Sequence, residues 1–415
     1  MKYGLIGEHL GHSFSKEIHE SISDYQYELC EVSLDDFDDF LNKRTFNAIN
    51  VTIPYKEKVL PYLDYIDDSA KLIGAVNTIV NKNGKLYGYN TDFLGLRDLI
   101  LVNNIDLTNK KVLILGTGGT SKTARVVAKT LKAIDVYFVS RKSSDVACSY
   151  EECYLKHSDA EVIINTTPCG MYPNCDDVIL DVSKFHKLEA VVDVIYNPLN
   201  TGIVRNALEL GIKAVNGLYM LVAQAVYASG IFLDKEYDKS IINSIYKKIK
   251  KQKQNIVLIG MPSSGKTTIG LLLSEKLNKS FVDTDDLITE TIGMPISSFL
   301  TKDNESDFRD IEENALKEIA LKNNLIISTG GGVIKRKSNI YRLKANGLVV
   351  FIDRPLDLLE ATNSRPLSNN KKDLEKLYLE RYDLYNSLCD IKITNNQNID
   401  DVVLEILNEV EKRYE

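Results

Sequence analysis

Short apolar runs recur along the chain, and longer stretches with a mixed polar and apolar pattern separate them. Runs that are apolar throughout and rich in β-branched residues are typical of strands buried on both faces of a parallel sheet. The mixed stretches are long enough for the helices that connect parallel strands. The clearest runs are residues 111–115, 136–139, 162–164, 191–194, 256–259, 325–327 and 348–352. This pattern predicts an α/β fold.

A polar stretch interrupts the pattern between about residues 234 and 254 and ends in a run of lysines. We expect a solvated terminal helix here that runs into a short linker. A new apolar run begins at Ile256, directly afterwards. The chain has 415 residues, and a single core stops growing at roughly 250–300 residues, so a domain boundary is required. We place it near Gln254.

Composition and charge exclude several classes of protein. The chain is 44% hydrophobic and 26% charged, which is typical of a globular protein, and its net charge of −7 gives no basic surface for nucleic acid. We find no signal peptide and no apolar run near the length of a membrane span. The six cysteines lack the paired spacing of a metal site and suit a reduced, cytoplasmic protein.

Residues 260–267 read GMPSSGKT and match the pattern G-x-x-x-x-G-K-[ST]. They follow a predicted strand and precede a helical run, which is the context that this motif requires. Its glycines let backbone N–H groups surround a phosphate, and the helix N-terminus adds positive potential. We expect Lys266 to reach the β- and γ-phosphates of ATP and Thr267 to bind Mg²⁺.

Carboxylates follow this motif in the segment FVDTDD, residues 281–286. Asp283 and Asp285 would project from the end of a strand, where they could orient Mg²⁺-bound water and accept a proton from a substrate hydroxyl. The chain has no histidine after residue 250, so a carboxylate is the base available there.

Three consecutive glycines, residues 330–332, allow a small ligand to approach the backbone closely. Arg309 and Arg381 suit a substrate carboxylate, because the guanidinium group can bind it through two hydrogen bonds. Arg365 lies in a polar loop and suits a lid that stabilises the transferred phosphate.

Residues 254–415 resemble shikimate kinase in the motifs GMPSSGKTT, FVDTDD, DFRDIEE, TGGGV, SRPL and RYDLY, in that order. The resemblance implies a P-loop kinase with a parallel sheet and a lid, and it makes Asp285, Lys266 and Arg365 catalytic. It implies that shikimate is held by Asp285, Arg309, Gly331, Gly332 and Arg381. It assigns ATP to Gly260, Ser263, Ser264, Gly265, Lys266, Thr267, Thr268 and Arg365, and Mg²⁺ to Thr267 and Asp283. Residues 359–364 lack the arginine that this family usually has near the adenine.

Another glycine-rich turn, GTGGTS at residues 116–121, follows the apolar run 111–115. It departs from G-x-G-x-x-G at Ser121, so alone it is a weak sign of dinucleotide binding. The next predicted strand ends in a short basic segment, where an NAD enzyme would carry an acidic residue. Basic residues suit the 2′-phosphate of NADP. The segment consists of Ser140, Arg141 and Lys142.

Hydroxyl and amide side chains cluster in residues 11–15, 50–56, 75–78 and 90–92. Such side chains in quantity indicate a polyhydroxylated substrate. A lysine and an aspartate beside the reacting hydroxyl could shuttle its proton during hydride transfer.

Residues 1–245 resemble shikimate dehydrogenase in the motifs HSFS, NVTIPYK, AVNT, NTD, GTGGT, NTTPCGM, DVIYNP and GLYMLVAQ. The resemblance implies that Lys56 and Asp92 are the catalytic pair. It assigns the substrate to Ser13, Ser15, Thr52, Asn77, Asp92, Tyr196 and Gln224. It assigns NADP to Gly116, Gly118, Gly119, Thr120, Ser140, Arg141, Lys142, Thr166 and Gly217. It implies a substrate-binding lobe of residues 1–93 plus 218–250 and a Rossmann-like NADP lobe of residues 94–217, before a kinase domain of residues 254–415.

Both resemblances lead to one carboxylated polyol. We interpret the chain as a bifunctional shikimate-pathway enzyme of aromatic amino acid biosynthesis, which reduces 3-dehydroshikimate with NADPH and phosphorylates shikimate with MgATP to shikimate 3-phosphate. The alternative is a quinate/shikimate dehydrogenase fused to a degenerate, binding-only kinase module. We expect small-molecule substrates as its partners, with no nucleic acid and no membrane, and a monomer or homodimer.

Overall fold

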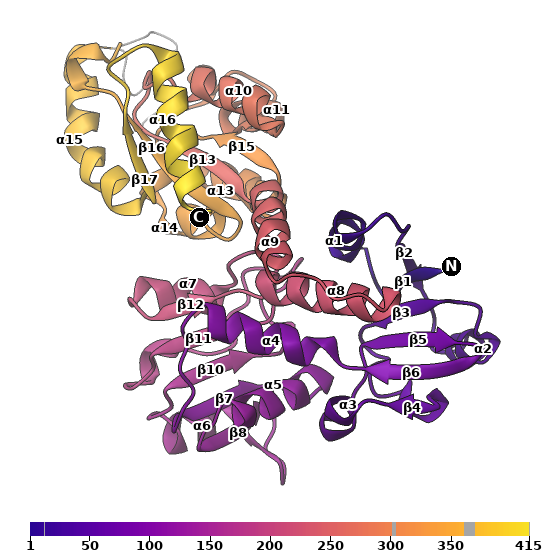
Figure 1. Cartoon of the computed structure of the whole chain (residues 1–415). Helices are drawn as coiled ribbons and strands as arrows, with labels where there is room; N and C mark the ends of the chain where they lie inside the picture. Colours follow the sequence, from indigo (N-terminus) through magenta and orange to yellow (C-terminus); the bar gives the residue numbers. More distant parts are fainter. Residues whose placement is uncertain (12, 301–303, 361–369, 415) are drawn as a thin grey trace. The chain divides into compact units, whose positions relative to one another are not determined.

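The chain divides into two compact units, and we describe each by itself. The computed structural model describes residues 1–11, 13–300, 304–360 and 370–414. Unit 1 is Met1–Ile249 and unit 2 is Lys250–Glu415 (Figure 1). Within the described residues, unit 1 contains two six-stranded sheets and unit 2 contains one five-stranded sheet. The α/β fold predicted from the apolar runs is confirmed.

The first sheet of unit 1 is mixed, with the strand order β2-β1-β3-β5-β6-β4. Strands β1, β2 and β3 are parallel, whereas β5 runs antiparallel to β3 and β6. Every residue of β3 is buried, as expected of a strand covered on both faces. The strands are β1 (Tyr3–Gly7), β2 (Glu28–Glu31), β3 (Ala48–Val51), β4 (Tyr65–Ile66), β5 (Thr78–Lys82) and β6 (Lys85–Tyr89). The helices of this region are α1 (Ser15–Ile22), α2 (Phe37–Lys43), the 3-10 helix η1 (Leu60–Tyr62) and α3 (Asp68–Ile73).

The second sheet of unit 1 is parallel throughout, with the order β12-β11-β10-β7-β8-β9. Four of the predicted apolar runs form β7, β8, β10 and β11. The expected burial on both faces is wrong for β8, in which only Val139 is buried. The strands are β7 (Lys111–Leu115), β8 (Asp135–Ser140), β9 (Ala147–Ser149), β10 (Val162–Asn165), β11 (Ala190–Asp193) and β12 (Lys213–Val215). The helices are α5 (Gly119–Thr130), α6 (Tyr150–Lys156), η2 (Val182–Lys184) and α7 (Gly202–Glu209).

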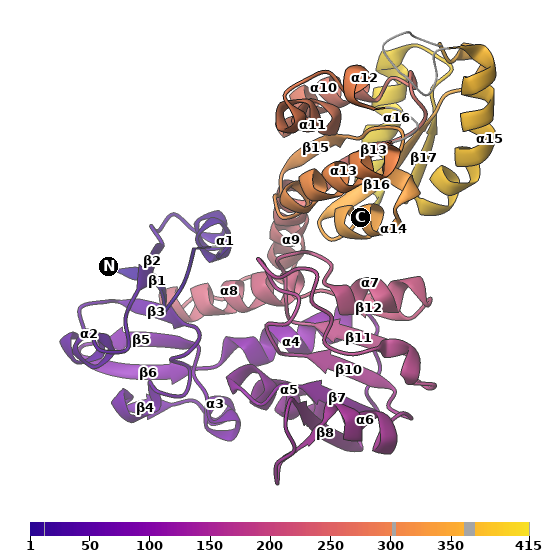
Figure 2. The ribbon, with the colours of Figure 1, turned by 180° about the vertical axis from the view of Figure 1, so that it is seen from behind.

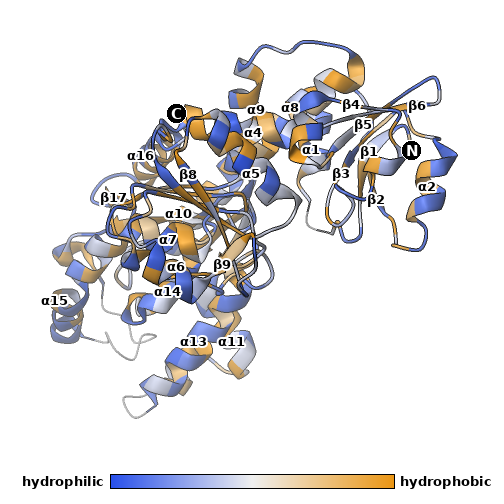
Figure 3. Cartoon of the chain, turned by 90° about the horizontal axis from the view of Figure 1, so that it is seen from below, coloured by the Kyte–Doolittle hydropathy of each residue, from blue (hydrophilic) through white to orange (hydrophobic). Residues whose placement is uncertain are grey.

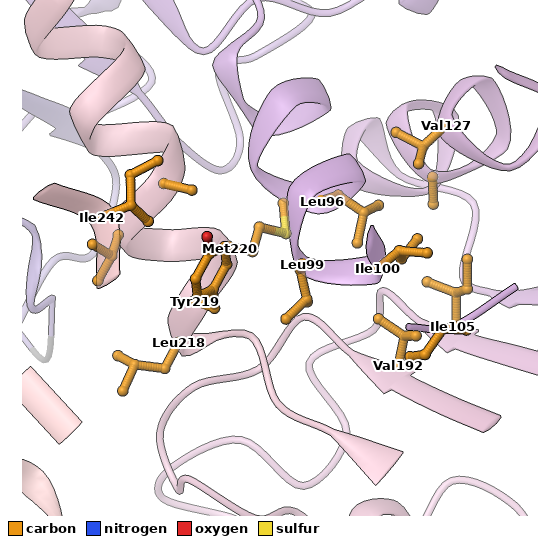
Figure 4. Close-up of a cluster of buried hydrophobic side chains, with 14 of the residues drawn as sticks. Leu96, Leu99, Ile100, Ile105, Val127, Val192, Leu218, Tyr219, Met220 and Ile242 are labelled. Atoms are coloured by element: carbon orange, nitrogen blue, oxygen red, sulfur yellow. The ribbon is translucent and has the colours of Figure 1, made fainter. Parts of the chain in front are cut away.

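Two long helices, α4 (Thr91–Val102) and α8 (Leu218–Leu233), lie side by side between the two sheets of unit 1 (Figure 1). Their contact is close at Gly95, where an added Cβ would lie 2.7 Å from the carbonyl oxygen of Met220. Leu96 and Leu99 of α4 gather with Met220 in one buried cluster (Figure 4). This cluster packs both helices against the second sheet, whereas Ala228 and Phe232 of α8 pack with Leu5, Ala48 and Val80 of the first sheet in another cluster.

The polar segment before the predicted boundary is almost entirely helical. Helix α9 runs from Ser240 to Lys253, and β13 begins at Asn255, so the expected linker is very short. Ile242, Ile245 and Ile249 are buried and recur at helical spacing. These isoleucines pack one face of α9, which leaves the lysines on the other.

Unit 2 has a parallel sheet with the order β14-β15-β13-β16-β17 (Figure 2). The three remaining apolar runs form β13, β15 and β16, whose residues are all buried. Hydrophilic and hydrophobic residues alternate along α13, which shows its two-sided character (Figure 3). The strands are β13 (Asn255–Ile259), β14 (Ser280–Asp283), β15 (Leu325–Ser328), β16 (Gly347–Asp353) and β17 (Ile391–Thr394). The helices are α10 (Lys266–Leu277), α11 (Thr284–Ile292), α12 (Ile296–Phe299), α13 (Glu305–Ala320), η3 (Val333–Lys335), α14 (Lys337–Leu343), η4 (Leu356–Leu358), α15 (Lys371–Leu388) and α16 (Ile399–Lys412).

No helix in the described part of the chain is long and apolar enough to cross a membrane.

Candidate active sites

A lysine and an aspartate form a partly buried pair in unit 1. Lys56 lies in the turn after β3, and Asp92 lies in the first turn of α4, where the side chain of Asn90 caps the helix. The Lys56 Nζ and Asp92 Oδ2 atoms are 2.6 Å apart, and these side chains are 16% and 9% exposed. Such a pair can pass a proton to or from a ligand oxygen. The structure therefore brings the two predicted catalytic residues together.

The glycine-rich turn between β7 and α5 lies beside this pair. A Cβ added to Gly119 would lie 3.7 Å from the Cβ of Lys56. Lys122 of α5 pairs with Glu57 at 2.7 Å, which ties the turn to the segment that carries Lys56. The predicted cofactor turn and the predicted catalytic pair are therefore neighbours.

Two predicted substrate residues, Asn77 and Gln224, meet at Thr91. Asn77 Oδ1 accepts a hydrogen bond from the Thr91 backbone N–H at 2.7 Å, and Gln224 Oε1 accepts one from Thr91 Oγ1 at 3.5 Å. All three residues are buried. Sequence analysis included Thr91 in the polar cluster of residues 90–92 but gave it no role of its own.

The predicted serine pair contacts the predicted tyrosine. Ser13 Oγ donates to Ser15 Oγ at 3.0 Å, and the phenol of Tyr196 hydrogen-bonds to Ser13. Burial raises the pKa of Tyr196, so its phenol stays protonated. Thr52 follows β3, four residues before Lys56. His12, in the same motif as the serines, lies outside the described residues.

Two of the predicted NADP positions accept no side chain. Gly116 has φ +107°, and an added Cβ would lie 2.9 Å from the Thr166 hydroxyl. At Gly217 an added Cβ would lie 2.0 Å from the carbonyl oxygen of Val194. These close approaches account for glycine at both positions. Thr120 lies in the first turn of α5.

The departure at Ser121 leaves the turn intact. Ser121 is buried, and its hydroxyl donates to the carbonyl oxygen of Gly118 at 2.6 Å. A Cβ at Gly118 would meet no atom within 4 Å, so the outer side of the turn is open. The small serine stabilises the turn from inside and leaves room for a dinucleotide.

The basic segment after β8 adjoins the glycine-rich turn. The backbone N–H of Gly116 donates to the carbonyl oxygen of Val139 at 2.8 Å, which links the two turns. Ser140 Oγ donates to the carbonyl oxygen of Lys142 at 2.5 Å, and Arg141 and Lys142 are exposed. Exposed cations beside the turn fit the 2′-phosphate of NADP.

In unit 2 the phosphate-binding motif forms the turn between β13 and α10. Lys266 is buried, and its Nζ donates to the carbonyl oxygens of Gly260 at 3.0 Å and Met261 at 2.9 Å. Gly260 and Gly265 have φ of +151° and +94°. Glycine tolerates these values, so the backbone can curl around a phosphate. Ser263, Ser264 and Thr268 lie in or beside the same turn.

A hydroxyl and a carboxylate offer a position for Mg²⁺. Thr267 Oγ1 donates to Asp283 Oδ2 at 2.9 Å, and Asp283 caps α11 by accepting from the Asp285 N–H at 3.0 Å. Among the described residues no three His, Cys, Asp or Glu side chains form a metal cluster. The arrangement still fits Mg²⁺, which usually takes one or two protein ligands together with nucleotide phosphates and water.

The predicted anion-binding arginine Arg309 is held in place by a glutamate. Arg309 is buried, and its Nη1 donates to Glu312 Oε2 at 2.9 Å. Burial raises the pKa of Glu312, and the neighbouring Arg309 opposes this shift. An added Cβ at Gly332 would lie 2.1 Å from Arg309 Nη2, so the guanidinium lies against this glycine. Sequence analysis missed Glu312, although it is three residues after Arg309 on one helix.

Arg381 contributes a second buried guanidinium group. Its Nη1 donates to the carbonyl oxygen of Gly331 at 2.9 Å, whereas its buried Nε and Nη2 find no hydrogen-bond partner in the described part of the chain. Unsatisfied buried N–H groups are costly, so they indicate an anionic ligand. The phenol of Tyr385 also donates to the Gly331 carbonyl oxygen. Sequence analysis missed Tyr385, which lies one helical turn after Arg381.

Asp285 lies beside the three glycines that follow β15, close to the side chain of Glu312. An added Cβ at Gly330 would lie 2.5 Å from Asp285 Oδ1 and 3.4 Å from Glu312 Oε1. A carboxylate base and buried guanidinium groups therefore converge at the end of β15. Arg365, the predicted lid arginine, lies outside the described residues.

Comparison with known proteins finds a family for each unit. The family model described as shikimate dehydrogenase substrate binding domain matches residues 5–79, and the one described as shikimate kinase matches residues 262–411. The NADP(+) shikimate dehydrogenase of Clostridium perfringens strain SM101 is 38% identical over 265 residues, which cover 60% of this chain and 98% of that protein.

Solved structures give the same result for unit 1. Shikimate dehydrogenase 1 of Peptoclostridium difficile is 38% identical with a TM-score of 0.57, covering 60% of this chain and 98% of that one. The Thermus thermophilus enzyme, solved with NADP(H) and shikimate, is 26% identical with a TM-score of 0.54, covering 60% and 99%. The chain therefore belongs to the shikimate dehydrogenase family and carries, in addition, a shikimate kinase domain.

Proposed function

We propose that unit 1 reduces 3-dehydroshikimate to shikimate with NADPH through Lys56 and Asp92, and that unit 2 phosphorylates shikimate with MgATP. The observation that carries the proposal is the Lys56–Asp92 pair, 2.6 Å apart, beside the glycine-rich turn that fits a dinucleotide.

In unit 1, bound NADPH supplies the hydride. The Lys56 ammonium group is the proton donor to the carbonyl oxygen of the substrate, and Asp92 holds that ammonium group in position. Asn77 and Gln224 orient the substrate hydroxyls, together with the serine pair. Exposed Arg141 and Lys142 hold the 2′-phosphate, which favours NADP over NAD.

In unit 2, bound MgATP supplies the phosphoryl group. Asp285 accepts the proton of the attacking hydroxyl, and Arg309 and Arg381 bind the substrate carboxylate through two-point hydrogen bonds. Lys266 neutralises phosphate charge, a role that the resemblance to shikimate kinase also assigns to Arg365. Thr267 and Asp283 hold the Mg²⁺.

A coupled assay tests both halves at once. The full chain receives 3-dehydroshikimate, NADPH, ATP and Mg²⁺, and the products are separated by chromatography. We expect NADPH oxidation together with shikimate 3-phosphate. Accumulation of shikimate alone would contradict the kinase assignment, and equal turnover with NADH and NADPH would contradict the cofactor assignment.

The alternative of a degenerate, binding-only kinase module is not favoured. The P-loop lysine, the Thr267–Asp283 pair and the buried Arg309 and Arg381 are all present in unit 2. A module that only bound nucleotide would have no need of two buried guanidinium groups around the glycines.

We also propose where the functional regions of the chain begin and end. We assign substrate binding to residues 1–93 plus 218–250, NADP binding to 94–217 and the kinase to 254–415, since the three sheets lie within these ranges. Six free thiols suit a reducing compartment such as the cytoplasm. The assembly is a monomer or homodimer, which light scattering of the purified chain would measure.

A further inference from the structure

A buried chain of hydrogen bonds runs from Tyr27 to the predicted substrate residue Asn77. The Tyr27 phenol donates to Asn50 Oδ1 at 2.7 Å, and Asn50 Nδ2 donates to Thr78 Oγ1 at 3.0 Å. Thr78 Oγ1 in turn donates to Asn77 Oδ1 at 3.0 Å. Each of these side chains is at most 4% exposed. Water therefore cannot easily replace a side chain that is removed from this chain. Each hydrogen bond depends on the residues at its two ends.

Backbone groups fix the orientation of the two amides in this chain. The carbonyl oxygen of Asn77 can only accept, and Asn50 Nδ2 donates to it at 3.2 Å. Asn50 Oδ1 must therefore face Tyr27, whose phenol must donate. At the other end, the Thr91 N–H can only donate, and it does so to Asn77 Oδ1. Asn77 Nδ2 is thereby turned to the other side, where it donates to Thr91 Oγ1 at 3.0 Å.

This arrangement gives the Asn77 amide one orientation. Its oxygen is occupied by donors from Thr78 and Thr91, and its nitrogen has two hydrogens but only one acceptor among these contacts. The second N–H of Asn77 is thus available to a ligand oxygen.

We propose that Tyr27 is a positioning residue for the dehydrogenase reaction, because its phenol holds Asn50 and Thr78 in the arrangement that presents the Asn77 N–H to an oxygen of the polyol substrate. This rests on the proposed role of Asn77 in unit 1. Tyr27 does not touch the substrate, so its removal affects how firmly the substrate is bound and oriented more than the proton transfer at Lys56.

The test is steady-state kinetics of the full chain with Tyr27→Phe. The variant keeps the ring but removes the phenol that donates to the buried Asn50 Oδ1. We expect KM for 3-dehydroshikimate to rise about tenfold, with kcat lowered by no more than about threefold and KM for NADPH unchanged. Kinase activity of the same preparation, measured with added shikimate, should equal that of the wild type.

Tyr25→Phe is the matched control. The Tyr25 phenol hydrogen-bonds to His19 Nδ1 at 2.6 Å, and the His19 ring stacks on Tyr27 at 3.9 Å, so Tyr25 belongs to the same aromatic cluster. Its phenol reaches Asn50 only indirectly, through the His19 ring, and makes no direct contact with the chain from Tyr27 to Asn77. We expect Tyr25→Phe to leave KM for 3-dehydroshikimate unchanged. An equal rise of KM in both variants would show general loosening of the cluster and overturn the proposal.

A double variant tests the route. If Tyr27 acts through Thr78, then Tyr27→Phe combined with Thr78→Val should have the same KM as Thr78→Val alone, within about twofold. Independent, multiplying effects would overturn the route, and an unchanged KM in Tyr27→Phe would overturn the proposal itself. A wild-type chain without turnover of 3-dehydroshikimate would instead overturn the proposed function, and this inference with it.

Discussion

The two units differ in how they prepare a site for a small, oxygen-rich acid. In unit 1 the predicted substrate residues are neutral amides and hydroxyls, and hydrogen bonds from other protein groups fix their orientation before any ligand is present. In unit 2 they are buried cations, and some of their N–H groups have no partner among the described residues. The amide oxygen of Asn77 in the first site is already hydrogen-bonded, whereas the guanidinium groups of the second site keep buried N–H groups that suit an anion.

This difference follows from the two reactions. Hydride and proton transfer create little net charge, so the orientation of the substrate matters most. Phosphoryl transfer moves a highly charged group, so charge neutralisation matters most. The first site accordingly holds the Lys56–Asp92 pair, and the second gathers Arg309, Arg381 and Lys266. Substitutions in each site can test this contrast.

Lys56→Ala removes the cation of the Lys56–Asp92 pair in the first site. We expect kcat for 3-dehydroshikimate reduction to fall about 10³-fold, because the proton donor is lost and Asp92 is left buried without its partner. Phosphorylation of added shikimate should be unchanged. A fall in both activities would show that the variant is misfolded or that the two sites depend on each other.

Lys266→Ala is the reciprocal change in unit 2. Loss of the cation that lies inside the phosphate-binding turn should lower kcat for shikimate phosphorylation by about 10²–10³-fold. NADPH oxidation with 3-dehydroshikimate should stay at the wild-type rate. Retention of phosphorylation would contradict the assignment of this turn to ATP.

Arg381→Ala tests whether the unsatisfied N–H groups await the substrate carboxylate. We expect KM for shikimate in the kinase assay to rise about 100-fold, whereas KM for ATP stays unchanged, because a charged two-point contact is lost. Arg342→Ala is the matched control, since Arg342 pairs with Glu313 at 2.6 Å on other elements of unit 2. A larger effect on ATP than on shikimate would move Arg381 to the nucleotide site.

Gly95→Ala tests how far the first site depends on fixed geometry. The new Cβ would lie 2.7 Å from the carbonyl oxygen of Met220 and 3.2 Å from the backbone nitrogen of Gln224. Helices α4 and α8 must then move apart at a cost of about 1–3 kcal/mol, and Gln224 moves with α8. KM for 3-dehydroshikimate should rise about tenfold. Kinase kinetics serve as the internal control, and an unchanged KM would show that Gln224 tolerates this shift.

Asp193→Asn replaces a buried carboxyl group of unit 1, which is protonated and uncharged at acid pH. Burial raises its pKa to about 7, while hydrogen bonds from Thr201, the Ile195 N–H and Asn165 oppose the shift. The folded state therefore keeps a proton that the unfolded chain loses near pH 4. Between these values the stability of wild-type unit 1 should fall as pH rises, by up to about 1.4 kcal/mol per pH unit.

The Asn variant should lack this slope, because it has no proton to lose. Unfolding in urea, followed by loss of dehydrogenase activity at pH 5 and pH 7, measures it. An equal change in the free energy of unfolding between pH 5 and pH 7 in the wild type and in the Asn variant would contradict the raised pKa of Asp193.

Much of this protein follows from its sequence. The apolar runs predicted seven of the strands, six of which are largely buried, since a continuous apolar run of that length has few other stable arrangements. The phosphate-binding turn was also predictable, because glycines and a helix start within eight residues make the site locally. The pairing of Lys56 with Asp92 was expected from resemblance alone, because 36 residues separate them along the chain.

Only the tertiary structure revealed the groups that hold these residues in place. Glu312 and Tyr385 are ordinary helix residues in the sequence, and their roles arise from contacts with Arg309 and Gly331. Tyr27 reaches Asn77 through a bond to Asn50, 23 residues away, and one from Asn50 to Thr78, 28 residues away. Sequence patterns record periodicity and local turn chemistry, which act between near neighbours. Buried hydrogen bonds between distant segments leave no such pattern, because they depend on which faces the packed sheets and helices bring together.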